Sequence, residues 1–66
     1  MTLRELRSAI LRELDGEWRT ATEIADTIGV GHGHDWFKVS LVLERLAADG
    51  LAELKRPGRV RRFRRA

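Results

Sequence analysis

Residues 35–50, DWFKVSLVLERLAADG, set the architecture predicted for the rest of the chain. They run for about four turns without an internal Gly or Pro. Asp35 is a favourable N-cap and Gly50 a favourable terminator, so this segment predicts a helix. At helical periodicity, one face is mostly apolar and is expected to pack inward: Trp36, Val39, Ser40, Leu43, Leu46 and Ala47. The opposite face carries Phe37, Lys38, Leu41, Glu44, Arg45 and Ala48.

The segment that follows this helix is strongly basic. Residues 55–66 contain seven Lys and Arg and no acid, so their formal charge is +7. Residues 1–54 contain six Lys and Arg against ten acids, so their formal charge is −4. Such asymmetry is expected of an element that binds a polyanion. A solvated basic tail is the alternative, but Val60 and Phe63 interrupt the run, and a free tail would not need them.

The same basic segment is predicted to form a β-hairpin. Residues 51–56 and 59–65 flank Pro57-Gly58, which suits the two central positions of a type II turn. Type II turns match two-residue hairpins poorly, so a longer tip is expected. Phe63 is the expected inward anchor of the second strand. On the first strand, the apolar residues alternate: Ala52 and Leu54.

Upstream, residues 2–5 (TLRE) fit a capping box and predict a first helix. Its buried stripe is predicted to contain Leu3, Leu6, Ile10 and Leu14, with Ala9 beside them. Gly16 is expected to end this helix in a left-handed conformation. Leu11 falls outside the stripe, and is either an ordinary exposed apolar residue or part of a self-association face.

A short strand and a second helix are predicted between residues 17 and 29. Residues 17–19 (EWR) suit a strand that pairs with the hairpin, with Trp18 pointing inward between charged neighbours. Residues 20–23 (TATE) repeat the capping pattern, and Gly29 is expected to end the helix. Its buried stripe is predicted to be Ile24, Ala25 and Ile28.

In this order, these segments resemble the winged helix-turn-helix family. The pattern T-x-x-E-I-A-x-x-I-G in residues 20–29 is similar to the first helix of the motif. The pattern V-S-x-x-L-x-x-L-x-x-x-G-L in residues 39–51 is similar to the second helix and its exit into the wing. The resemblance implies an α+β fold over residues 1–66 as a single domain, with three helices, a short strand and a C-terminal β-hairpin wing. One departure is a longer connection than the family's tight turn, since Val39 comes ten residues after Gly29.

The resemblance implies a small DNA-binding transcriptional regulator. Helix 35–49 would enter the major groove, and the wing, residues 55–65, would meet the phosphate backbone or minor groove. The physics of the wing supports this independently, because arginine suits bidentate phosphate contact and insertion into a narrow minor groove. The expected contacts to double-stranded DNA are Lys38, Ser40, Arg45, Arg56, Arg59, Arg61, Arg64 and His34.

Two alternatives concern residues on or near the same helix. Phe37 and Leu41 are apolar where base-reading faces are usually polar, which favours a protein-interaction module or a weak homodimer as the second hypothesis. His32 and His34 would contact phosphate or bases, or would be ordinary loop residues. A metal site formed by these histidines and Asp35 is disfavoured, because neighbouring glycines would not hold the ligands in a defined geometry.

The remaining features favour a cytoplasmic protein, nucleoid-associated if bacterial or archaeal, with no enzymatic activity and no cofactor. The sequence has no Cys, so it predicts neither a disulfide nor a thiolate metal site. Residues 1–10 mix charged and apolar residues, which predicts neither a signal peptide nor a membrane span. No histidine accompanies a patterned nucleophile, and no phosphate-binding glycine loop follows a strand.

Overall fold

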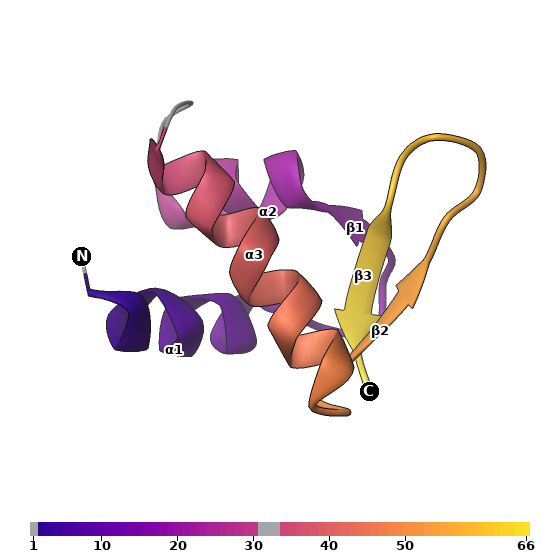
Figure 1. Cartoon of the computed structure of the whole chain (residues 1–66), viewed down its shortest axis with the longest axis horizontal. Helices are drawn as coiled ribbons and strands as arrows, with labels where there is room; N and C mark the ends of the chain where they lie inside the picture. The colour runs from indigo at the N-terminus through magenta and orange to yellow at the C-terminus, as the bar shows by residue number, and fades with distance from the viewer. Residues whose placement is uncertain (1, 31–33) are drawn as a thin grey trace.

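Three helices and a three-stranded antiparallel sheet make up the fold, which confirms the α+β class (Figure 1). The computed structural model describes residues 2–30 and 34–66, apart from the side chains of His34 and Asp35. In chain order the elements are α1 (Leu3–Glu13), β1 (Arg19–Thr20), α2 (Ala21–Ile28), α3 (His34–Ala48), β2 (Ala52–Lys55) and β3 (Arg62–Arg65). Within the described ranges, no helix has the length and apolar character needed to cross a membrane.

The sheet has β3 at its centre, with β1 on one side and β2 on the other. Phe63 lies opposite Arg19 of β1 and opposite Leu54 of β2. The predicted pairing of a short early strand with the hairpin is therefore confirmed, although the strand begins at Arg19 rather than Glu17. Ala52 is buried, whereas Leu54 is partly exposed.

Every helix and both hairpin strands contribute to one hydrophobic core. Phe63 is fully buried in it, as predicted from its place within the basic run. The predicted inward faces of α2 and α3 are also largely confirmed. The buried apolar residues are Leu6, Ile10, Leu14, Ile24, Ala25, Val39, Leu43, Leu46, Ala52 and Phe63.

Helices α2 and α3 both end at a glycine with positive φ, as predicted. Gly29 has φ of 82° and Gly50 has φ of 81°. In each case the glycine N–H and the next residue's N–H donate back to carbonyls of the last turn, the pattern of a Schellman motif. After α3, Leu51 N donates to Leu46 O at 2.9 Å. A residue with a Cβ would be strained at either glycine, so these positions set where both helices stop.

The end of α1 differs from the prediction. The helix stops at Glu13, Leu14 caps it in an extended conformation, and Gly16 does not have a positive φ. The extended backbone at Leu14 accompanies burial of its side chain. Asp15 then shapes the turn, because its carboxylate accepts the Glu17 N–H at 2.9 Å and so removes the need for a left-handed glycine.

Two leucines of α1 have exchanged their predicted roles. Leu3 is 62% exposed although it was placed on the inward stripe, and Leu11 is partly buried against the core. The reason lies in the first turn, where the Thr2–Glu5 capping box forms as predicted and leaves Leu3 at the outer end of the helix. Leu11 follows the buried Ile10 and packs partly against the core, so it is not the ordinary exposed residue of the first alternative.

Trp18 was predicted to point into the core, and this is also wrong. Phe63 and Arg19 are directly opposite residues, and directly opposite residues share a face of the sheet. Because neighbouring residues alternate, Trp18 belongs to the other, outer face. There its ring lies 4.4 Å from Lys55 Nζ and 4.4 Å from Arg64 Cζ. Neighbouring residues alternate between the two faces of the sheet as predicted, but Trp18 lies on the outer face and Arg19 on the inner face.

Helix α3 begins at His34, one residue before the predicted cap Asp35. The capping role of the Asp35 side chain lies outside the described part of the chain. So do residues 31–33, which contain most of the lengthened connection between α2 and α3.

Replacing Phe63 by Ala should lower the free energy of unfolding by about 3–5 kcal/mol, because it removes a fully buried ring and leaves a cavity. The measurement is urea denaturation followed by circular dichroism. Phe37→Ala is the matched control, since Phe37 is 60% exposed, and its cost should stay within about 0.5 kcal/mol. Similar losses for the two variants would contradict the central role of Phe63.

The turn after α1 should give the protein an acid-sensitive contribution to stability. Hydrogen bonds from the Arg19 guanidinium and the Glu17 N–H hold the pKa of Asp15 below its ordinary 3.8. A lowered pKa in the folded state stabilises the fold above pH 3.8, and this contribution disappears as the pH falls through the folded-state pKa. Asp15→Asn should therefore melt at a lower temperature than the parent at pH 7. The difference should close in strong acid, and a constant difference across the whole pH range would contradict this explanation.

Candidate nucleic-acid interface

The loop between β2 and β3, residues 56–61, carries exposed cations of the basic segment. It is longer than the Pro57-Gly58 turn alone, as predicted, and Gly58 has a positive φ of 76°. This hairpin loop projects away from the helices (Figure 1). Arg56 and Arg59 are exposed, and neither contacts an acid or a hydrogen-bond acceptor in the part of the chain described.

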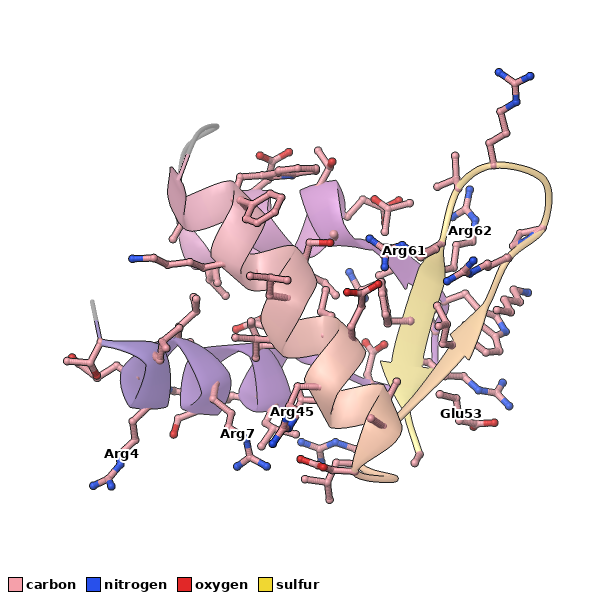
Figure 2. All side chains as sticks on the ribbon, in the orientation of Figure 1. Arg4, Arg7, Arg45, Glu53, Arg61 and Arg62 are labelled. Atoms are coloured by element: carbon pink, nitrogen blue, oxygen red, sulfur yellow. The ribbon has the colours of Figure 1, made fainter. Side chains whose placement is uncertain are left out.

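Arg61, at the end of the hairpin loop, instead turns toward α3. Its guanidinium donates to Ser40 Oγ at 2.8 Å and forms an ion pair with the Glu44 carboxylate (Figure 2). Ser40 is only 8% exposed. Two residues predicted to contact DNA, Arg61 and Ser40, are therefore bound to each other and fasten the base of the loop to α3.

Arg64 and its neighbours on the outer face of the sheet are also engaged. Arg64 Nε donates to Glu53 Oε1 at 2.9 Å while its guanidinium lies over Trp18, with Lys55 near the same ring. Cations near an aromatic ring are attracted by its quadrupole, so the indole holds both strands of the hairpin together. Arg64, which was predicted to contact phosphate, is thus already bound to Glu53 and Trp18 within the fold.

Two further arginines of the basic segment contact the helices. Arg62 Nη1 lies 3.9 Å from Glu23 Oε1 of α2, and Arg65 donates to the carbonyl of Leu11 in α1. The acidic body and the basic segment, which the sequence distinguished by charge, are thus joined by ion pairs. Among the cations of the basic segment, Arg56 and Arg59 have neither an acid nor a hydrogen-bond acceptor nor a ring as a partner in the described part of the chain.

The outward face of α3 contains the other predicted contacts. Lys38 and Arg45 are both exposed. Arg45 Nε lies 4.0 Å from Asp49 Oδ1, but its side chain is 80% exposed, so this ion pair is weak. Phe37 and Leu41 are also exposed, as predicted from the helical pattern. The helix therefore presents two cations and two apolar side chains to its surroundings.

A cleft connects α3 with the hairpin loop. It has a volume of about 240 Å³ and lies between the start of α2, one side of α3 and the loop. Arg59 and Val60 line it from the loop, and Trp36 and Ser40 line it from α3. The folding of the chain thus places the unpaired Arg59 beside the helix, although the two are far apart in sequence.

His34, the remaining predicted contact, opens α3, but its side chain lies outside the described part of the chain. The same holds for the histidine pair and Asp35 considered as metal ligands. Among the residues that the structure describes, no group of three or more His, Cys, Asp or Glu side chains is placed to hold a metal ion.

Comparisons with protein families, with curated proteins and with solved structures found no match for this chain.

Replacing Arg61 by Gln should free the hairpin loop from α3. Backbone ¹⁵N heteronuclear NOE values over residues 56–60 should fall, while the free energy of unfolding decreases by only about 1 kcal/mol, because the lost contacts are hydrogen-bonded but partly exposed. Arg59→Gln is the control with the same charge change, and it should leave these NOE values unaltered. Equal NOE changes in both variants would show that Arg61 does not fasten the loop.

Proposed function

We propose that this chain is a winged helix-turn-helix domain that binds double-stranded DNA. The order of elements supports the proposal: a helix and a short strand precede two packed helices, and a basic hairpin follows. The sheet order β1-β3-β2 places that hairpin against α3. In this arrangement α3 acts as the probing helix and the hairpin loop as the tip of the wing.

The observation that carries the proposal is the pair of exposed arginines, Arg56 and Arg59, on the loop beside α3. Neither has an acidic partner within the described residues, so a phosphate would not need to displace a carboxylate from them. Each phosphate neutralised by such a cation releases condensed counterions, which drives association. Arginine also suits a narrow minor groove, where the negative potential is strongest.

Arg61 and Arg64 take a supporting role in this proposal. Each would have to leave a carboxylate, Glu44 or Glu53, before it met a phosphate. Exchanging a carboxylate for a phosphate gains less binding free energy than forming an ion pair with a cation that had no partner. Their contribution is therefore to position the hairpin, and the loop arginines supply the direct contacts.

On α3, Lys38 and Arg45 supply the contacts that would discriminate between sequences. Both side chains suit the O6 and N7 acceptors of guanine in the major groove. Phe37 and Leu41 lie on the same exposed face, and apolar side chains there meet thymine methyl groups. Together with the loop, this gives four cationic contacts: Lys38, Arg45, Arg56 and Arg59.

The test is a titration of duplex DNA over a range of salt concentrations. Two phosphate contacts, by Arg56 and Arg59, predict a slope of log K against log salt of about −1.8, and Arg59→Gln should reduce its magnitude by about 0.9. The control is Arg12→Gln, which removes the same charge from an exposed position on α1 and should leave the slope unchanged. A slope near zero, or no binding at low salt, would refute DNA binding. Equal effects of the two substitutions would refute the role of the loop.

A further inference from the structure

A separate feature is an apolar groove between α1 and α3, on a surface that the proposed wing does not form. It has a volume of about 740 Å³. Leu3 and Leu41 are exposed side chains that line it from opposite helices, and Val42 and Ala48 complete its apolar lining. Two large exposed leucines across one groove form a surface that water solvates poorly, and such surfaces commonly bind another molecule.

The rim of this groove is positively charged. Arg4 and Arg7 line it from α1, and Arg45 lines it from α3. Arg7 and Arg45 share a single carboxylate, that of Asp49, at 3.9 Å and 4.0 Å. Arg4 has no ion-pair partner in the described part of the chain. Two guanidinium groups therefore share one weakly held acid, and a third guanidinium lies on the same rim.

Glu44 also lines the groove, but it does not neutralise this rim. Its carboxylate is already bound by Arg61 from the hairpin side of α3. The groove thus combines an apolar floor with an excess of positive charge along its edges, and a partner that fits it must have the complementary pattern.

We propose that this groove binds an acidic amphipathic helix of another protein. Leucine-type side chains of that helix would fill the floor beside Leu3 and Leu41, and its carboxylates would meet Arg4, Arg7 and Arg45. Two helices with an apolar channel between them suit the helix-in-groove mode of recognition. The proposal does not rest on DNA binding, although the groove shares Leu41 and Arg45 with the face of α3 that is proposed to contact DNA.

The charges argue against two other occupants. A second copy related by a two-fold axis would place the same surface against itself, so that the arginine rims would face each other. A DNA backbone would satisfy the arginines, but it offers no apolar side chains to cover Leu3 and Leu41. An acidic amphipathic helix satisfies both parts of the surface.

The proposal is tested with a fluorophore-labelled helical peptide of about 16 residues, a length at which helices begin to be stable. It carries leucines at helical spacing with glutamates on both flanks, and a second peptide has lysines in place of the glutamates. Fluorescence anisotropy with the full chain measures both affinities. The acidic peptide should bind at least about tenfold more tightly than the basic one, because its flanks oppose the arginine rim.

The matched variants are Leu41→Gln and Phe37→Gln, which make the same kind of change at exposed positions of one helix. Only Leu41 lines the groove, so Leu41→Gln should weaken the acidic peptide about tenfold and Phe37→Gln less than about twofold. Circular dichroism of both variants verifies that they are folded.

Three outcomes would overturn the proposal. The first is that neither peptide binds, or that both bind equally. The second is that the two glutamine variants lose the same affinity. The third is that sedimentation shows a dimer of the chain that Leu41→Gln abolishes, because a second copy would then occupy the groove.

Discussion

Burial of the Phe63 ring joins the sheet to the helices, and the arrangement of the basic segment depends on it. Phe63 lies in the central strand, opposite residues of both neighbouring strands, and its side chain is fully buried. Once it points inward, strand alternation sends Arg62 and Arg64 to the outer face and leaves Arg61 on the side of α3. Burial of this one apolar residue thus determines which side of the sheet each neighbouring arginine occupies.

A second consequence is that part of the positive charge of the basic segment is paired within the molecule. Ion pairs with Glu23, Glu44 and Glu53 engage three of its arginines. The +7 segment and the −4 body therefore attract each other, and the net surface available to an external anion is smaller than the sequence charge indicates. Arg56 and Arg59 of the hairpin loop have no acidic partner among the described residues.

Local signals in the sequence predicted the helices and the hairpin well, because their causes are local. Capping threonines, glycines with positive φ and the periodicity of α3 act within a few residues, and Phe63 stood out as the one aromatic in a basic run.

The errors have non-local causes. The face occupied by Trp18 depends on the register of β1 against β3, and the partners of Arg61 lie on another element, 21 residues away for Ser40. Gly16 does not end α1 because the Asp15 carboxylate forms the turn instead. Both residues favour a turn at this point, and the sequence pattern does not show which of the two forms it. The DNA contacts on α3 and the loop remain predictions.

The position of Thr20 limits how the molecule can change shape when it binds a partner. It is the last residue of β1, and its hydroxyl also accepts the Glu23 N–H at the start of α2, so strand and helix share one residue with no linker between them. Because no residue separates β1 from α2, this junction has no flexible segment that could act as a hinge. The sheet cannot rotate against α2 without breaking either the strand pairing or the helix cap. Within the described ranges, the six residues of the hairpin loop lie outside any helix or strand, so they can adapt to a curved or irregular surface without breaking this junction.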